Sequence, residues 1–235
     1  MFDFVRKPLL WSAWEQGLHK DIGRTPKFHL KSIQDLAVYQ QIKDARGKDI
    51  AEIGGGHSRL LNVLGKANNC TNVEKFEGRD GGPARTQLFS RAKNISAYLG
   101  EFDPQLAASS FDIVLSVSVI EHVETPKLDA FYQDQLRILK PGGVFVHAID
   151  LYLEDTPRPY IVERFNIYKS WVDGSRGDSV APLGAIYDGP CKFTCDIATN
   201  PDDVMFAWGG VSKDMSAMRL TAQSTSIIVG GQKRF

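Results

Sequence analysis

Hydrophobic positions recur along the chain with two periods, one typical of strands and one typical of helices. The run 111–116 is apolar at almost every position and includes β-branched residues, which predicts a strand covered on both faces near the centre of a sheet. Further strands are predicted at 48–53, 70–76, 95–98 and 144–149, and helices at 31–46, 58–66, 84–92, 127–139 and 161–172. Two extended runs, near 202–208 and 218–229, end the chain. Strands separated by helices imply an α/β fold with a parallel, doubly wound sheet.

The composition narrows the class of protein without indicating a reaction. The chain has 235 residues and is 43% hydrophobic, which is enough for one domain with a full core. Lysine plus arginine and aspartate plus glutamate balance at 28 each, so no strong positive field favours binding to nucleic acid. The three cysteines are too few and too scattered for a disulfide framework or a zinc site, and we expect reduced thiols in the cytoplasm.

Residues 2–14 are rich in aromatic and aliphatic side chains, which are interleaved with Arg6 and Lys7. This mixture is found in helices that lie on membranes, so weak peripheral contact is one interpretation. The alternative is a helix that packs on the domain or closes over a cofactor. No stretch of the sequence approaches the roughly 20 apolar residues that span a bilayer, so we expect no integral membrane segment.

Three consecutive glycines, Gly54, Gly55 and Gly56, stand where the strand 48–53 turns into a helix. Glycine permits the unusual φ values of such a turn and lets backbone amides approach a ligand, while the helix that begins near Ser58 directs its N-terminus at that ligand. A dinucleotide-binding turn has the pattern G-x-G-x-x-G, but the position of its last glycine is occupied here by Arg59. The turn therefore predicts a cofactor site other than one for NAD.

An acidic residue and the end of the central strand should face the same crevice as this turn. Glu74 follows Gly54 by twenty residues at the end of a predicted strand, and its carboxylate can accept hydrogen bonds from both hydroxyls of a ribose. Glu77 is the alternative if that strand runs further. Open α/β sheets bind ligands at the carboxyl ends of their strands, so residues 116–118 should pass beneath the ligand.

Four motifs follow one another between residues 48 and 150. Glu52, Gly54 and Gly56 match the pattern acidic-x-G-x-G-x-G, with Ser58 in place of the third glycine, a small residue that is also a good helix cap. The other three motifs are FD at 111–112, SVIEHV at 118–123 and LKPGG at 139–143. Their order resembles that of the class I S-adenosylmethionine-dependent methyltransferases. The SVIEHV run resembles many members of this superfamily that act on small molecules.

The resemblance implies a Rossmann-like, mostly parallel sheet of seven strands that ends in a C-terminal antiparallel hairpin. It also implies that S-adenosyl-L-methionine is the cofactor, with Glu52 near its ammonium group, Glu101 at the amine of its adenine and Phe102 over the ring. The expected cofactor-binding residues are Glu52, Gly54, Gly55, Gly56, Ser58, Glu74, Glu101, Phe102, Ser116, Val117 and Ser118.

Methyl transfer needs a nucleophile held in line with the activated methyl group, and a hydroxyl also needs a base or a metal. His122, just past the central strand, could be that base, orient a loop or bind the cofactor. Asp150 lies at the carboxyl end of its strand, and resemblance to sugar and natural-product O-methyltransferases supports it as a catalytic residue. A metal would need Asp150 to meet other acidic residues, and a solvated acidic loop at 154–155 is the preferred interpretation, so we expect no metal.

We interpret the chain as one methyltransferase domain over residues 1–235. Its parts are an N-terminal helical segment at 1–47, a cofactor-binding core at 48–150, a substrate-side insertion at 151–200 and the hairpin at 201–235. The expected acceptor is a small molecule, with a hydroxyl on a sugar, glycolipid or secondary metabolite placed ahead of a nitrogen. Methylation of protein or nucleic acid and a non-catalytic binding protein remain alternatives, and the oligomeric state stays open.

Overall fold

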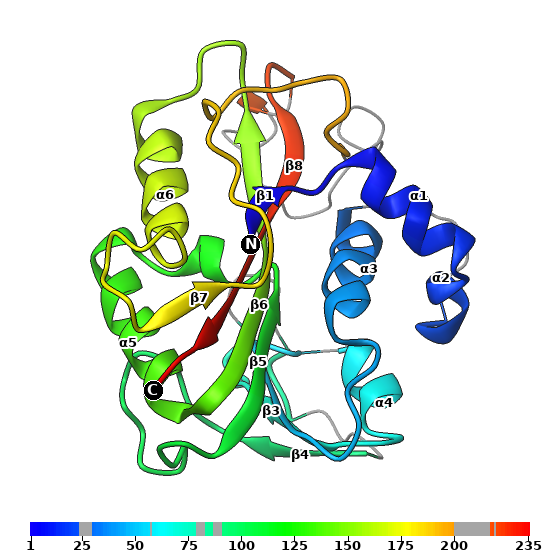
Figure 1. The fold of residues 1–235 in the computed structure, drawn as a ribbon, viewed down its shortest axis with the longest axis vertical. Coiled ribbons are helices and arrows are strands. Elements are labelled where there is room, and N and C mark those ends of the chain that lie inside the picture. Colours follow the sequence, from blue (N-terminus) through cyan, green and yellow to red (C-terminus); the bar gives the residue numbers. More distant parts are fainter. Residues whose placement is uncertain (24–29, 57, 79–82, 87–90, 200–216, 219) are drawn as a thin grey trace.

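The computed structural model describes residues 1–23, 30–56, 58–78, 83–86, 91–199, 217–218 and 220–235. These residues form one mixed sheet between two layers of helices (Figure 1). Its strands are β1 (Phe2–Phe4), β2 (Asp49–Ile53), β3 (Asn69–Val73), β4 (Ala92–Ile95), β5 (Phe111–Val117), β6 (Leu139–Leu153), β7 (Val180–Pro182) and β8 (Gln223–Lys233). The helices are α1 (Lys7–Glu15), α2 (Leu18–Asp21), α3 (Leu30–Ile42), α4 (Leu60–Leu64), α5 (Leu128–Ile138) and α6 (Pro159–Ser170), with short 3₁₀ turns η1 (Ile120–His122) and η2 (Thr125–Lys127).

The predicted α/β fold with a mostly parallel sheet is confirmed. Strands β2 to β6 are parallel in the order β4-β3-β2-β5-β6, and β8 lies antiparallel between β6 and β1. Over the described residues the sheet has eight strands where seven were expected, because β1 and β7 both pair with β8. The run 202–208, which was expected to form the first strand of the hairpin, lies outside the described residues.

Two further sequence predictions need correction. A helix was expected at 84–92, but residues 84–86 and 91–92 are not helical, and 87–90 lie outside the described residues. Ala92 instead begins β4, because it pairs with Cys70 of β3. The LKPGG segment was expected to end a helix and turn into a strand, but it lies within β6. The pairing runs from Phe111 with Leu139 to Ile113 with Val144, so the extra residues are accommodated as an irregularity in the strand.

Each face of the sheet has its own apolar core. Helices α5 and α6 cover one face, and α1, α3 and α4 cover the other (Figure 1). Side chains alternate between the two along β6, where Phe145 and Ile149 belong to the first core and Val146 and Ala148 to the second. Because both faces are covered, the parallel strands offer ligands only the edge where their carboxyl ends meet.

The N-terminal segment does not form the helix considered over residues 2–14. Residues 2–4 form the strand β1, where Phe2 and Phe4 are fully buried against Phe165 of α6, with ring centroids 4.8 and 5.6 Å apart. Pairing with β8 satisfies the backbone here, so the aromatic side chains serve the core and face no membrane. The helix α1 packs against α3, with Trp11 exposed. Among the helices described, none combines the length and apolar character needed to cross a bilayer.

Candidate functional site

A cavity of about 630 Å³ opens at the carboxyl ends of β2, β3 and β5. Its walls come from the glycine turn, the segment after β3, the loop at 97–101, the segment from the end of β5 through η1, and the start of α3. The predicted site residues that line it are Glu52, Gly54, Gly55, Gly56, Ser58, Glu74, Glu101, Val117, Ser118 and His122. Most of the residues selected from the sequence therefore meet around one space.

The glycine turn leaves no room for side chains. Gly54 has a φ of +63°, and a Cβ atom placed on it would lie 2.5 Å from Val119 Cγ2. A Cβ atom on Gly55 would lie 2.4 Å from Asn72 Oδ1. That oxygen is buried and has no hydrogen-bond partner among the described residues. The turn therefore packs so tightly on Val119 and Asn72 that Gly54 and Gly55 must be glycines.

Glu52 is buried beneath this turn, and Ser58 donates a hydrogen bond to its Oε2 atom. Burial penalises the charged form and raises the pKa of Glu52 to about 8. Ser58 Oγ also accepts a hydrogen bond of 3.1 Å from Leu61 N at the start of α4, so Ser58 is a helix cap as its residue type suggests. A carboxyl group held in this way can receive a cationic ligand group without reorganising.

Both acidic residues considered after β3 line the cavity, so the choice between them stays open. Glu74 directly follows the last residue of β3, and its Oε1 atom accepts a hydrogen bond of 3.3 Å from Phe76 N. Glu77 accepts a hydrogen bond of 3.1 Å from the hydroxyl of Tyr98. Each side chain could receive a ligand hydroxyl at this wall of the cavity.

The loop expected to contact adenine is only partly in the cavity wall. Glu101 lines the cavity, whereas Phe102 lies outside its lining and is half exposed, with a φ of +55°. Asp134, a buried residue of α5 that the sequence analysis missed, accepts hydrogen bonds from the backbone of Gly100 (2.7 Å) and Phe102 (3.0 Å). Its ion pair with Arg137 fixes the carboxylate in place.

A group of acidic and polar side chains adjoins the cavity just past the end of β5. Asp150, which was expected at the carboxyl end of its strand, lies within β6, because pairing with β8 continues to Leu153. Ser118 Oγ lies 2.5 Å from Glu121 Oε1 and 2.9 Å from Asp150 Oδ1, within hydrogen-bonding distance of both. Gln34 of α3 donates a hydrogen bond to the same Asp150 oxygen. Ser118 lines the cavity, whereas Glu121 and Asp150 lie outside its lining. We call Ser118, Glu121 and Asp150 the acid group.

Burial and the nearby Asp150 carboxylate raise the pKa of Glu121 to about 8, against the opposing effect of the Lys31 ammonium. The second oxygen, Glu121 Oε2, is buried and unpartnered among the described residues. The predicted base His122 has its Nε2 atom 3.8 Å from Glu121 Oε1, and its side chain is 43% exposed. The acid group therefore holds a carboxyl oxygen that can accept a proton or a hydrogen bond from a ligand.

The comparisons with known proteins agree with this arrangement. Residues 51–147 match the family model described as a methyltransferase domain. The chain therefore carries a methyltransferase domain over these residues. The Burkholderia thailandensis and Streptomyces coelicolor structures described below contain S-adenosylhomocysteine. No curated protein matches the sequence.

Solved structures match the fold of the methyltransferase at low sequence identity. A putative sarcosine dimethylglycine methyltransferase from Galdieria sulphuraria has a TM-score of 0.51 and 12% identity, covering 97% of this chain and 85% of its own. The 1,6-didemethyltoxoflavin-N1-methyltransferase of Burkholderia thailandensis has 0.51 and 14%, covering 97% and 88%. The geranyl diphosphate C-methyltransferase of Streptomyces coelicolor A3(2) has 0.55 and 10%, covering 85% and 79%. At such identities these likenesses show the fold alone.

The methyltransferase contains an ion pair at the glycine turn that the sequence analysis did not find. Arg59, noted only because it excludes a dinucleotide pattern, pairs with the buried carboxylate of Asp35 on α3, with Nη2 and Oδ1 2.8 Å apart. Both residues line the cavity. The ion pair holds the start of α4 against α3. No local signal could have revealed it, because the two residues are 24 positions apart in different elements.

Two other polar residues lie outside the cavity lining. Ser116 is fully buried, and its hydroxyl lies 2.8 Å from His147 Nδ1. Burial lowers the pKa of His147 to about 3, so this histidine is neutral and belongs to the core. Among the described residues, no three histidine, cysteine, aspartate or glutamate side chains gather as metal ligands.

Proposed function

We propose that this methyltransferase transfers a methyl group to a hydroxyl of a small molecule that binds beside the acid group. The observation that carries the proposal is the pair of carboxyl groups at Ser118, next to the cofactor cavity. A hydroxyl is a poor nucleophile until it loses its proton, and two carboxyl groups at one point provide an acceptor for that proton. The acceptor class expected is a sugar, a glycolipid or a secondary metabolite.

The glycine turn, Glu52 and Ser58 hold the amino-acid end of the cofactor in this proposal, and Glu74 binds its ribose. When bound, S-adenosylmethionine supplies a methyl group activated by the positive sulfur. The cavity walls align the acceptor oxygen with that methyl group and exclude water, and such positioning can contribute about 7 to 11 kcal/mol. A carboxylate of the acid group would accept the hydroxyl proton as the acceptor oxygen takes the methyl group.

Glu121 and Asp150 divide this work according to their surroundings. Asp150 receives a hydrogen bond from Gln34, whereas burial and the Asp150 carboxylate raise the pKa of Glu121 to about 8. A base is most effective when its pKa lies near the working pH. We therefore assign proton acceptance to Glu121 and orientation of the acceptor to Asp150, with His122 at the outer side of the pair.

A small acceptor is favoured by the dimensions and charge of the site. The cavity of about 630 Å³ falls in the range of roughly 300–1,000 Å³ that is usual for small-molecule sites. The balanced charge of the chain disfavours a nucleic acid acceptor. The Burkholderia and Streptomyces neighbours are named for methylation at N1 of 1,6-didemethyltoxoflavin and at carbon of geranyl diphosphate, so the fold by itself does not select oxygen.

The test uses S-adenosylmethionine with a labelled methyl group and a panel of small alcohols, sugars and amines. We expect label on an oxygen of an acceptor, identified by NMR of the product. Asp150→Asn and Glu121→Gln should each lower kcat by about 100-fold while S-adenosylmethionine still binds, since general base catalysis typically contributes roughly 10²- to 10⁴-fold. Asp155→Asn is the matched control, because Asp155 is an exposed acid in the neighbouring loop.

Three outcomes would contradict the proposal at different levels. Labelled methyl groups found only on nitrogen would contradict a hydroxyl acceptor, but they would still show methyl transfer. Full activity of both acid variants would overturn the role of the acid group. Failure of the wild-type protein to bind S-adenosylmethionine in calorimetry would overturn catalysis itself, and the fold would then serve a non-catalytic role.

A further inference from the structure

An arginine on α6 reaches across to the turn that carries the acid group. Nη2 of Arg164 lies 2.8 Å from the carbonyl oxygen of Ile120 and 3.3 Å from that of Glu121, and Nη1 lies 2.9 Å from that of Val123. Nη1 also lies 3.2 Å from the hydroxyl of Thr125. One guanidinium group therefore binds three backbone carbonyl groups of η1 and of the residue that follows it.

The buried side chain of Ile120 anchors the turn η1 in the core, but few backbone hydrogen bonds among the described residues hold it. It is a single 3₁₀ turn of three residues, and its own bonds are His122 N to Val119 O (3.0 Å) and Val123 N to Ile120 O (3.1 Å). The carbonyl groups at the end of a short helix have no partner within that helix. Arg164 supplies donors at that end, and its planar fork can satisfy several acceptors at once.

The position of η1 matters for the cofactor as well as for the acid group. Val119, His122 and Val123 all line the cofactor cavity. Val119 packs so closely on the glycine turn that a Cβ atom at Gly54 would lie 2.5 Å from it. A shift of η1 would therefore alter the wall opposite the glycine turn.

Arg164 is itself held by Tyr168, one turn further along α6. The Tyr168 hydroxyl lies 2.8 Å from Arg164 Nε and 2.6 Å from Nη2. The Tyr168 side chain is fully buried and packs edge-on against Trp171, with ring centroids 5.5 Å apart. Burial raises the pKa of Tyr168 to about 12, so the phenol stays neutral at physiological pH. The guanidinium thus rests on a rigid part of the core.

We infer that Arg164 is a positioning residue that holds η1, and with it Glu121 and the cavity wall at Val119 and His122, in the geometry needed for binding and transfer. The part of this inference that concerns Glu121 rests on the proposed function; the part that concerns the cavity wall does not. Helix α6, which follows β6 in sequence, is thereby joined to the turn η1, which follows β5.

The experiment measures binding of S-adenosylhomocysteine by calorimetry, so it needs no knowledge of the acceptor. Arg164→Gln removes the charge and the fork, and we expect the dissociation constant to rise about tenfold. Arg164→Lys keeps the charge and can reach one carbonyl at a time, so its dissociation constant should lie between those of Arg164→Gln and the wild type. Tyr168→Phe removes only the hydroxyl that orients the guanidinium and should weaken binding about threefold.

Arg158→Gln is the matched control. Arg158 lies at the start of the same helix and pairs with Glu154, and none of its hydrogen bonds within the described part of the chain reaches η1. Binding by this variant should stay within about twofold of the wild type. Thermal unfolding is measured for every variant, and binding is compared well below the transition. If Arg164→Gln unfolds at a lower temperature yet binds S-adenosylhomocysteine as the wild type does, Arg164 is merely structural and the inference is wrong.

If Arg164→Gln does not fold, Tyr168→Phe decides, because it changes neither charge nor volume appreciably. Unchanged binding by Tyr168→Phe, with Arg164→Lys also equal to the wild type, overturns the inference. Failure of the proposed function leaves a different signature: there Asp150→Asn and Glu121→Gln retain activity, whatever the Arg164 variants do to cofactor binding.

Discussion

The site has two halves, the glycine turn with Glu52 and the acid group, and the two are built in different ways. The glycine turn and Glu52 lie within five consecutive residues, so their geometry follows from one strand-to-helix connection. The acid group joins residues 118, 121 and 150 and depends on Gln34 and Arg164 from two further helices. A local turn can be preserved while its surroundings vary, whereas the acid group depends on the tertiary packing. If the acid group receives the acceptor as proposed, this difference would let one fold keep its methyl donor and change its acceptor.

The largest expected effect comes from adding a side chain to the glycine turn. Gly55→Ala places a Cβ atom 2.4 Å from Asn72 Oδ1 and 3.3 Å from Glu52 Cδ, both in buried side chains. The turn must then shift away from the position that lets backbone amides approach the cofactor. We expect S-adenosylmethionine binding to weaken at least about 100-fold, measured by calorimetry.

Gly184→Ala is the control for that substitution. Gly184 has an ordinary φ, and an added Cβ atom would meet only Met1 Cβ at 3.7 Å, an ordinary contact. Its binding constant should equal that of the wild type. Binding by Gly55→Ala within about threefold of the wild type would mean that the turn tolerates a side chain and is not the cofactor cradle.

The same contrast explains what the sequence could predict. The parallel sheet and the residues around the cavity were accessible because Glu52, Gly54 and Glu74 follow strands that periodicity identifies. Arg164 and Asp134 were missed because their partners are backbone groups more than 30 positions away, and no pattern marks a residue that binds a distant carbonyl or amide. Glu121 was seen within a motif, but its burial, and with it its pKa, depends on how η1 packs.

The edge of the sheet was missed for a related reason. Phe2 and Phe4 alternate with a polar residue as in a strand, but the segment is too short for periodicity to separate it from the helix that follows. The partner that makes it a strand, β8, lies more than 200 residues away. Strand pairing over such a distance is fixed by the tertiary fold alone.

A second prediction uses pH to compare the two halves, since Glu52 and Glu121 each have a pKa of about 8. Both values are raised above that of an unfolded glutamate by burial, so the folded protein binds these protons more tightly. Each carboxyl group therefore contributes stability that is complete below about pH 4.5 and is lost as pH rises through about 8. In urea unfolding we expect the contribution of these two groups to the free energy of unfolding, measured as the difference between the wild type and variants that lack them, to fall over this window.

Single variants separate the contribution of Glu52 to this pH dependence from that of Glu121. Glu52→Gln and Glu121→Gln should each remove their own part of this contribution, at least about 1 kcal/mol for a buried carboxyl, and the double variant should remove both parts. Turnover should change in the opposite direction, because Glu121 accepts a proton only when ionised, so kcat of the wild type should rise through about pH 8. If the difference in stability between the wild type and the double variant does not change from about pH 5 to about pH 8.5, the raised pKa values are wrong.

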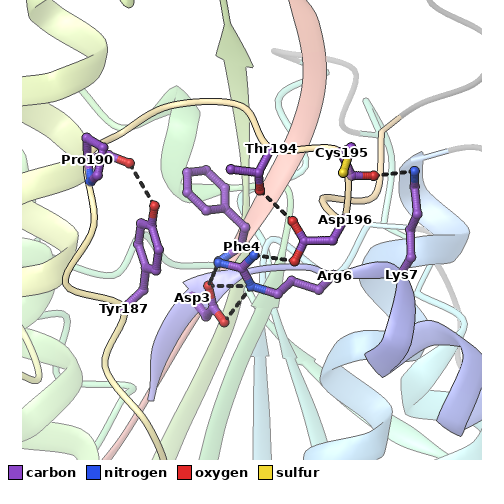
Figure 2. Close-up of polar contacts among 9 residues, drawn as sticks. All are labelled: Asp3, Phe4, Arg6, Lys7, Tyr187, Pro190, Thr194, Cys195 and Asp196. Carbon is purple, nitrogen blue, oxygen red and sulfur yellow. Dashed lines mark hydrogen bonds and ion pairs between the residues drawn. The ribbon is translucent and has the colours of Figure 1, made fainter.

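The smallest expected effect lies far from both halves, in the contacts that hold the N-terminal strand. Figure 2 shows Arg6 between Asp3 and Asp196, with Nη2 2.8 Å from Asp3 Oδ1 and Nη1 2.5 Å from Asp196 Oδ2. The guanidinium also lies over the ring of Tyr187, 5.2 Å from its centroid. These ion pairs are partly exposed, so their contribution is reduced by solvent, and Arg6→Gln should lower the free energy of unfolding by only about 1 kcal/mol.

The Arg6 substitution should leave cofactor binding unchanged, because neither Arg6 nor its partners line the cavity. Its effect on urea unfolding should shrink at high salt, which screens partly exposed charges. Lys43→Gln is the control, since Lys43 pairs only loosely with the exposed Asp44, at 3.8 Å, and its loss should not be measurable. A large loss of S-adenosylmethionine affinity in Arg6→Gln would show that the N-terminal strand is coupled to the site. The site would then depend on a third part of the molecule, the edge of the sheet, besides the local cofactor turn and the packing-dependent acid group.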